Sequence, residues 1–491
     1  MLLVALGVLG AAAALFLINL GDQALWQDEG MTAAVSRTIL GGGLPRGFDG
    51  RNYFSQELGS EYGPGYVWRW QAWLPYYLLA AFFRLFGCST FVARLPCALA
   101  GLATVPSTYL LARRLFKDRA VGWAAAALLA VNVPFLLLSR QCRYYSLAAL
   151  FAVWCLLAYV ALERKARWAG AALVAAATLL FHVQYVYVGT LYLTLLLHAH
   201  TRQRALVRPV LVSGVVTALI NAPFIVWFAG MKYWASYGGS LRMLRTPLIH
   251  AGTFLVQLIA RTWPPLFLIA LAVALYAAAG EQQSKPRDRW AWALCWQFFA
   301  VHLVVLSLAS PAAFFRYLAP LLPVGCVALG LLTVKALRWR PWFAAVLTGG
   351  LVLGAPLPSF LHELTHHYRG PIDGILDYLR TEAHPGQMVA ITYGDLPLKF
   401  YRPDLRILGG LTGEDLGPAR QADFVIIRQH VVCSKDQAVR DWLLANIAWS
   451  RYQKVELDAP DARFQNRESL PEHRFRTATD EPHVVVYRRV R

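Results

Sequence analysis

The feature that most constrains this chain is a series of apolar runs that repeats from residue 1 to residue 359. Each run has about twenty residues, the length of helix that crosses the hydrocarbon core of a bilayer. Of the 491 residues, 57% are hydrophobic and only 15% are charged. The sequence therefore predicts a polytopic α-helical membrane protein. Residues 360–491 are more polar and form a separate part.

The net charge of +19 lies in the membrane part. Residues 360–491 contain 18 Lys and Arg and 18 Asp and Glu, which cancel. Short cytoplasmic loops collect Lys and Arg, so membrane topology explains the excess and no nucleic-acid partner is expected. We assign five short basic segments to the cytosol: residues 112–119, 163–167, 201–208, 285–289 and 335–340.

The positions of these segments predict the topology. Residues 1–20 have neither a basic start nor a small-residue cleavage site, so we expect a retained first helix that begins in the cytosol. Two apolar runs, 72–87 and 96–111, follow the first outer loop, yet only an odd number of crossings returns the chain to the cytosol. One of the two is therefore short, re-entrant or parallel to the surface, and about eleven helices cross the membrane.

The last apolar run, 341–359, carries the polar tail outside. We predict a catalytic transmembrane domain at 1–359, with a first outer loop at about 21–71. The runs at 388–394, 423–429 and 483–489 resemble strands and 435–448 resembles a helix, so 360–491 is expected to be an extracytoplasmic α/β domain. The localisation expected is the plasma (inner) membrane.

Acidic residues on the outer side are confined to the first outer loop and the tail. Asp28 and Glu29 stand in "QDEG" directly after the first apolar run, and Glu61 follows in the same loop. A reaction on the outer face that needs a base must take it from this loop or from the tail. The alternative is that the pair is solvated at a helix start, where negative charge suits the helix dipole.

Basic and aromatic groups gather at the other predicted outer turns. The stretch "SRQCRYYSL" (139–147) contains two arginines three residues apart, which a helix would place on one face. Such arginines face a cavity or a partner, or else extend to lipid headgroups, and tyrosines also form belts at the membrane interface. The candidate substrate-binding residues are Glu61, Arg69, Arg140, Arg143, Tyr144, Tyr145, His182, Tyr185, Arg316 and Tyr317.

Some of these candidates have ordinary alternatives. A lone histidine such as His182 is more often a hydrogen-bonded packing residue than a catalyst. The outer loop at 231–245 is aromatic and basic as well. Together these residues predict an outer-face cavity with acids on one wall and arginines on the others.

This pairing suits the transfer of a sugar from a lipid phosphate. Cleavage places negative charge on the departing phosphate, which preformed cations stabilise, while a carboxylate accepts the proton of the attacking hydroxyl. A divalent metal would need hard oxygen ligands from more than one loop, so we favour a site without a metal or other cofactor. The segment "HELTH" (362–366) matches a zinc motif literally, but no third ligand is evident and a metalloprotease is not favoured.

At these residues the chain resembles the GT-C superfamily of membrane glycosyltransferases, in the aminoarabinose transferase and protein O-mannosyltransferase branch. The shared features are "QDEG", "RLPCALAGLATVPSTYLLARRLF", "SRQCRYYSL" and "RYLAPLLP", in that order over roughly residues 1 to 335. Many relatives have a Pro-Pro-Leu motif before the second helix, whereas this chain reads "EYGPGYVWRWQAWLPYY".

The resemblance implies a polyprenyl-phosphate-linked sugar as donor and inversion at the anomeric carbon. It makes Asp28 the catalytic carboxylate of the first outer loop, with Glu29 beside it, and places Arg140, Arg143 and Arg316 near the donor phosphate or sugar. The acceptor would be an envelope lipid, glycan or protein hydroxyl. A secondary transporter and a non-catalytic scaffold for envelope polymer assembly are the alternatives, although no internal repeat or mid-membrane charge favours a transporter.

Overall fold

The computed structural model describes residues 2–229, 245–261, 286–310, 312–353, 356–429, 434–462 and 482–490. Most of the basic outer loop predicted at 231–245 lies outside these ranges, as does most of the apolar run at 248–280. The described chain divides into two compact units. The first is formed by residues 1–18 and 97–364, and the second by residues 19–96 together with the tail from Thr365 onward.

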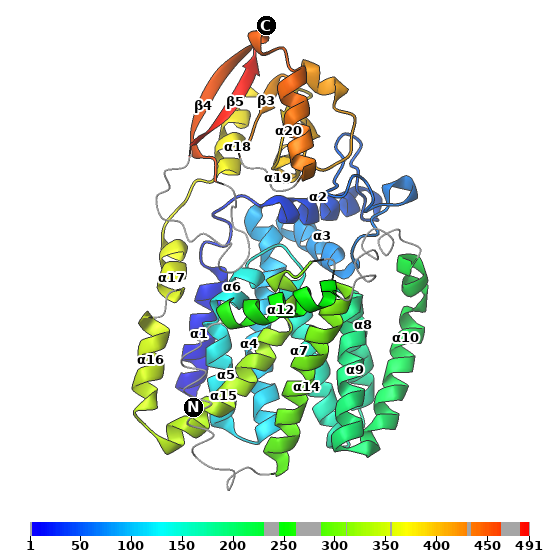
Figure 1. Ribbon diagram of the computed structural model, residues 1–491, viewed down its shortest axis with the longest axis vertical. Coiled ribbons are helices and arrows are strands. Elements are labelled where there is room, and N and C mark those ends of the chain that lie inside the picture. The colour runs from blue at the N-terminus through cyan, green and yellow to red at the C-terminus, as the bar shows by residue number, and fades with distance from the viewer. Residues whose placement is uncertain are drawn as a thin grey trace. The chain divides into compact units, whose positions relative to one another are not determined.

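The first unit is helical. Its elements are α1 (Leu2–Leu17), α4 (Thr90–Phe116, of which residues 90–96 belong to the second unit), α5 (Arg119–Ala130), α6 (Val133–Ser139), α7 (Tyr145–Glu163), α8 (Ala169–Phe181), α9 (Tyr185–Arg202), η2 (Arg204–Leu206), α10 (Val207–Ala229), α12 (Arg245–Arg261), α14 (Pro286–Ala309), η5 (Phe315–Leu318), α15 (Leu321–Trp339), α16 (Phe343–Leu353) and α17 (Leu357–Thr365). Figure 1 shows α7, α9, α14 and α15 running along one another.

The described residues contain five helices long and apolar enough to cross a membrane. They are Thr90–Phe116, Tyr145–Glu163, Arg204–Trp227, Pro286–Ala309 and Leu321–Trp339. The pair α5 and α6 makes a sixth if it counts as one span, bent by 62°. The bend follows from sequence: the Asn132 side chain caps α6 at the Phe135 amide, and Pro134 lacks the amide that a continuous helix needs. The polytopic helical class is thus confirmed, while the count of about eleven crossings stays a prediction.

Several predicted spans are shorter in the structure. The run at 72–87 forms α3 (Leu74–Phe86) with 13 residues, whereas the run at 96–111 belongs to the 27-residue α4. A helix of 13 residues is about 20 Å long, too short for a core of about 30 Å. The short member of the two runs is therefore 72–87. The runs at 168–185 and 341–359 likewise form helices of 13 and 11 residues.

The basic segments assigned to one side of the membrane meet at one end of the first unit. Arg164 donates to the Arg114 carbonyl at 2.7 Å, and Arg287 donates to the Leu115 carbonyl at 3.0 Å. Ion pairs join the same segments: Arg287 with Glu163 (2.8 Å), Lys335 with Asp288 (2.9 Å) and Arg338 with Asp118 (2.8 Å). The segments at 112–119, 163–167, 285–289 and 335–340 therefore share one end of the unit, as predicted, and Asp118, Glu163 and Asp288 are paired there. Their assignment to the cytosol remains a prediction.

The second unit contains a five-stranded sheet in the order β2-β1-β3-β5-β4. Its strands are β1 (Met388–Ile391), β2 (Arg406–Gly409), β3 (Phe424–Ile426), β4 (Tyr452–Pro460) and β5 (His483–Arg489), and its helices are α2 (Gln27–Gly42), η1 (Pro64–Tyr66), α3, α18 (Pro371–Glu382), α19 (Asp395–Tyr401), η6 (Gly417–Gln421), α20 (Ser434–Asn446) and η7 (Trp449–Arg451). β1 is parallel to β2 and β3, whereas β5 is antiparallel to β3 and β4.

Alternation along the strands explains how both faces of the sheet are covered. Val389 and Ile391 pack with α18, while Ala390 between them packs with Leu443 of α20. The three predicted strands and the predicted helix at 435–448 are present. The sequence did not predict β2, β4, α18 or α19. The short strand β2 is enclosed on both faces, with Ile407 on one side and Leu408 on the other, so it lacks an alternating polar pattern.

The first outer loop is part of this second unit, which the boundary drawn at residues 359 and 360 did not anticipate. The Ala24 amide donates to Asp373 at 2.9 Å, and the Leu25 amide donates to the Tyr401 hydroxyl at 3.0 Å. Arg37 of α2 donates to the Phe400 carbonyl at 2.6 Å and the Lys399 carbonyl at 3.1 Å, at the end of α19. Helix α2 is therefore held on α19.

Gly30 makes the contact between α2 and α19 testable. A Cβ atom at Gly30 would lie 2.4 Å from the Pro397 nitrogen, which is backbone and cannot turn aside. Gly30→Ala should therefore lower the free energy of unfolding by about 1–3 kcal/mol. Gly41→Ala on the same helix is the control, since a Cβ atom there meets nothing within 4 Å. Equal thermal unfolding midpoints for the two variants would contradict this packing.

Candidate functional site

The two adjacent acids of the first outer loop have different surroundings. Glu29 is fully buried and forms a bidentate pair with Arg94, with 2.9 Å from Nε to Oε1 and 2.8 Å from Nη2 to Oε2. The same carboxylate accepts the Trp26 amide at the start of α2. Arg94 is also buried and donates to the Leu20, Gln23 and Ala24 carbonyls. The Glu29 carboxylate is thus committed to holding the loop, which argues against a catalytic role.

Sequence reasoning did not assign a role to Arg94. Its signal was present, because an arginine inside the apolar segment "RLPCALAG" must have a buried partner. What the sequence lacked was the identity of that partner, 65 positions earlier in the chain.

Asp28 is the more accessible of the two acids. Its side chain is partly exposed, and Oδ1 accepts a hydrogen bond of 3.0 Å from Nε2 of Gln56. A partly exposed carboxylate can meet an acceptor hydroxyl, which a fully buried one cannot. Of the two predicted catalytic residues, Asp28 is the one whose surroundings suit a general base.

Glu61 orders the turn that presents Gln56. The carboxyl group is buried and accepts the Ser55 hydroxyl and the backbone amides of Gln56 (2.6 Å) and Glu57 (3.0 Å). Burial raises the pKa of Glu61, and these hydrogen bonds oppose the rise. Glu61, predicted to bind substrate, has its carboxyl group occupied by this turn instead. Through Gln56 it fixes the group that contacts Asp28.

Arg69 lies in the same loop as Glu61. Its amide donates to the Glu61 carbonyl at 2.8 Å, and its guanidinium lies against Gly63, where a Cβ atom would come within 2.7 Å of Nε. The absence of a side chain at Gly63 therefore makes room for Arg69.

The first unit gathers a second set of predicted residues. The guanidinium of the buried Arg143 lies 5.8 Å from the ring centre of Tyr144 and 6.0 Å from that of Tyr145. The guanidinium of Arg316 lies 4.2 Å from the Phe314 ring. We call Arg143, Tyr144, Tyr145, Tyr187, Arg316 and Tyr317 the arginine–tyrosine cluster.

Tyr187 connects the two halves of this cluster and was missed in the sequence. Its hydroxyl donates to the Tyr317 carbonyl at 3.0 Å, and it lies within electrostatic reach of Tyr144, Tyr145 and Arg316. The sequence pointed to Tyr185 instead. They are two positions apart on α9, and only the packing decides which of them faces the cluster. Tyr185 contacts the Phe181 ring and is itself within electrostatic reach of Tyr144.

Arg140 and His182 have structural surroundings. Arg140 donates to the Leu15 and Phe16 carbonyls, at 3.1 and 3.0 Å, and so satisfies the last turn of α1. His182 packs edge-on against Phe224 at 4.6 Å between ring centres and hydrogen-bonds with Asn221. For His182 the packing alternative describes the contacts better than substrate binding does.

The arginine–tyrosine cluster lies at the opposite end of the first unit from the basic ion pairs. Tyr145 begins α7 and Glu163 ends it, while Tyr317 precedes α15 and Lys335 stands near its end. Charges at the two ends of this unit thus differ in kind. One end consists of paired charges, and the other contains the buried Arg143 and the half-buried Arg316 among aromatic rings.

Metal ligands are not grouped in the part of the chain that the structure describes. No three His, Cys, Asp or Glu side chains lie close enough together there to hold a metal ion. The "HELTH" segment accordingly has no third ligand among the described residues. Independence from metals remains a prediction.

The helical unit, with Arg143 buried in it, and the α/β unit that contains the first outer loop have the fold of the GT-C membrane glycosyltransferases. Residues 71–227 match the family described as dolichyl-phosphate-mannose-protein mannosyltransferase. The chain is similar to ArnT from Cupriavidus metallidurans bound to undecaprenyl phosphate, with a TM-score of 0.59 and 15% identity over 98% of this chain and 97% of that one. For ArnT in the apo state the TM-score is 0.60, at the same identity and coverage.

These matches confirm the resemblance drawn from the sequence at the level of the fold. A comparison with curated protein sequences finds no match.

The contrast between the two acids predicts different effects on stability. Glu29→Gln leaves Arg94 buried without its partner charge, so the free energy of unfolding should fall by about 3–5 kcal/mol. Asp28→Asn keeps an oxygen for Gln56 and should cost about 1 kcal/mol at most. Thermal unfolding in detergent measures both. A Glu29→Gln variant as stable as the unmodified protein would show that the pair does not hold the loop.

Proposed function

We propose that this protein is an integral-membrane glycosyltransferase that moves a sugar from a polyprenyl-phosphate donor to an acceptor hydroxyl. The observation that carries the proposal is the partly exposed Asp28 carboxylate, oriented by Gln56 beside a neighbour committed to Arg94. Support comes from the mannosyltransferase family match and from the fold shared with ArnT, whose structure contains undecaprenyl phosphate. The matched family is named for a dolichyl phosphate, and the ArnT structure contains undecaprenyl phosphate. Both compounds are polyprenyl phosphates, so we choose this class of donor.

Asp28 acts as the general base in this proposal. It takes the proton of the acceptor hydroxyl as the oxygen attacks the anomeric carbon, and the bond from that carbon to the phosphate oxygen breaks. The electron pair goes to the departing polyprenyl phosphate, which gains one negative charge. Attack opposite the leaving group inverts the anomeric centre.

Arg143 and Arg316 stabilise the departing phosphate in this proposal. Cations that are already in place when charge develops lower the barrier without reorganising. The aromatic rings beside both guanidiniums, Tyr144 for Arg143 and Phe314 for Arg316, restrict their movement, since arginine stacks on aromatic faces. The roles of Asp28 and of the two arginines are assigned separately and are tested separately.

The cellular setting follows from the same proposal. The protein lies in the plasma (inner) membrane and acts on its outer face, with the α/β domain on the extracytoplasmic side. The acceptor is a lipid, glycan or protein of the envelope. The test of the activity is incubation of the purified protein with a panel of polyprenyl-phosphate-linked sugars and envelope extracts, with release of polyprenyl phosphate as the readout. Absence of release with every donor would overturn the proposal.

Asp28→Asn should abolish transfer, by roughly 10²–10⁴-fold in rate, while donor binding persists. The change keeps the shape of the side chain and removes the base. Glu57→Gln, a second carboxylate of the same loop, is the control and should retain activity. Turnover of Asp28→Asn near that of the control would refute the assignment.

Arg143→Ala and Arg316→Ala should lower turnover more than donor affinity, by about 10²–10³-fold, because the charge they meet grows as the bond breaks. Lysine should rescue only in part, since it lacks the planar fork that contacts two phosphate oxygens. Arg164→Ala, at the opposite end of α7, controls for loss of a helix-end arginine. Unchanged turnover in both cluster variants would identify these arginines as lipid or packing contacts.

A further inference from the structure

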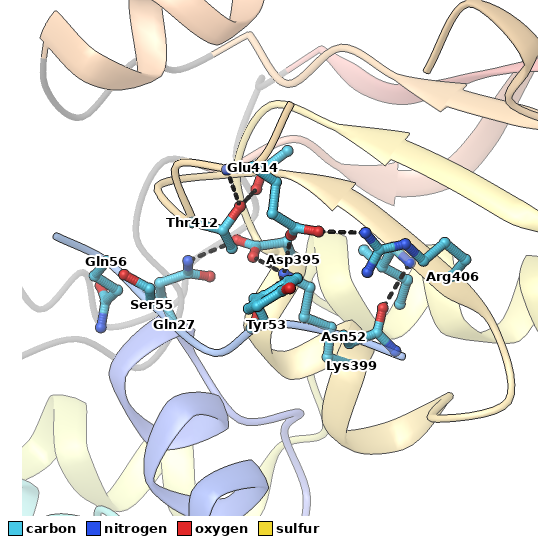
Figure 2. A network of polar contacts seen from close by, with 12 residues as sticks. Gln27, Asn52, Tyr53, Ser55, Gln56, Asp395, Lys399, Arg406, Thr412 and Glu414 are labelled. Atoms are coloured by element: carbon cyan, nitrogen blue, oxygen red, sulfur yellow. Dashed lines mark hydrogen bonds and ion pairs between the residues drawn. The ribbon is translucent and has the colours of Figure 1, made fainter. Parts of the chain in front are cut away.

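A buried ionic network joins the first outer loop to the α/β domain within the second unit (Figure 2). Lys399 and Asp395 stand one turn apart on α19 and pair at 2.8 Å, and both side chains are wholly shielded from solvent. The second carboxylate oxygen of Asp395 accepts Nε2 of Gln27 at 2.8 Å, and Nζ of Lys399 donates to the Tyr53 carbonyl at 2.9 Å. Both ends of the pair therefore reach the first outer loop.

The network continues on the other side of Lys399. A carboxylate oxygen of Glu414 lies 4.0 Å from Nζ, and its second oxygen pairs with Arg406, which in turn donates to the Arg51 carbonyl. Asn52 completes it, accepting the Ile407 amide at 2.8 Å and donating to the Leu405 carbonyl at 2.9 Å. Two cations and two carboxylates balance, so the network carries no net charge.

The place where this network meets the loop has a functional consequence. Gln27 is the first residue of α2, and Asp28 follows it directly. Asp395 lies 368 positions away in the sequence from Gln27. Since α2 is also held along α19 by Arg37 and by the close approach at Gly30, the direction of its first turn depends on α19.

We propose that Asp395 and Lys399 are positioning residues for the reaction: through Gln27 and Tyr53 they fix the first turn of α2 and with it the direction of the Asp28 carboxylate. This inference rests on the proposed function, because it takes Asp28 as the base. Neither residue contacts substrate. The α/β domain thereby acts on the chemistry at a distance, as part of the support of the catalytic loop.

Buried ion pairs also stabilise domains without serving a site, and the same domain provides a control of that kind. Arg428 and Asp461 form a buried pair, and Arg428 further donates to the Ala462 carbonyl. The contacts described for this pair lie within the tail. Lys399→Met and Arg428→Met each remove one buried cation, replace it with an unbranched uncharged side chain and leave a carboxylate behind.

The experiment measures amide hydrogen exchange over α2 and steady-state kinetics in the full-length protein. Lys399→Met should speed exchange of peptides from α2 about 10-fold or more and lower turnover roughly 10–10²-fold, with donor affinity unchanged, because a small misplacement of a catalytic group costs this much. Arg428→Met should reduce the thermal unfolding midpoint but leave α2 exchange and turnover at their original values.

Gln27→Ala removes a single hydrogen bond and serves where Lys399→Met does not fold. It should reproduce the loss of turnover, and Gln27→Ala combined with Asp395→Ala should lose little more turnover than Asp395→Ala alone, because both changes remove the same hydrogen bond. Independent losses in the double variant would overturn the route through Gln27.

The outcomes separate this inference from the proposed function. Unchanged α2 exchange in Lys399→Met and Gln27→Ala overturns the inference whatever the activity. Faster exchange with unchanged turnover overturns the positioning role and leaves the proposed function standing. A loss of turnover in Arg428→Met equal to that in Lys399→Met also overturns the positioning role. No transfer by the unmodified protein overturns the proposed function, and the positioning role with it.

Discussion

The bidentate pair between Glu29 and Arg94 determines the arrangement of the first outer loop. Two opposite charges without solvent are tolerated only when their remaining hydrogen-bonding groups are satisfied. Here three carbonyls of residues 20–24 and the Trp26 amide supply these contacts. The chain is consequently fixed as it turns from residue 20 into α2. Asp28 stands in the first turn of that helix, next to the residue that Arg94 holds.

Polar groups of the second unit contact the start of α2 from the first outer loop and from α19. Glu61 fixes the turn that contains Gln56, and Gln56 contacts Asp28. On the α19 side, Asp395 holds Gln27, as Figure 2 shows. Asp28 thus has a hydrogen-bond partner, Gln56, that is fixed in the first outer loop, and the residue before it, Gln27, is fixed by Asp395. Preorganisation of this kind is what a general base needs, because a carboxylate that reorients freely loses much of its rate advantage.

The helical unit illustrates a different division of charge. At one end, arginines and lysines pair with Asp118, Glu163 and Asp288. At the other end Arg143 lies buried among tyrosine rings. The asymmetry was visible in the sequence as basic segments at alternate helix ends. The aromatic surroundings of Arg143 and Arg316 were visible as well, because Tyr144, Tyr145 and Tyr317 are their neighbours along the chain. Tyr187 was not, because it reaches the cluster from another helix.

The sequence by itself determined the class of fold and much of the organisation. The local patterns are the apolar runs of helical length, the basic segments at alternate helix ends and the three strand-like runs in the tail. Each pattern depends on whether its own residues face lipid, water or the protein interior. Tertiary structure alone decided which of two adjacent acids is buried, that the run at 72–87 is the short helix, and that the first outer loop joins the tail in one unit. These outcomes depend on partners far away in the chain: Arg94 for Glu29, and Asp395 for Gln27. No local pattern specifies such a partner, because the energy of a buried charge is set by the groups that surround it after folding.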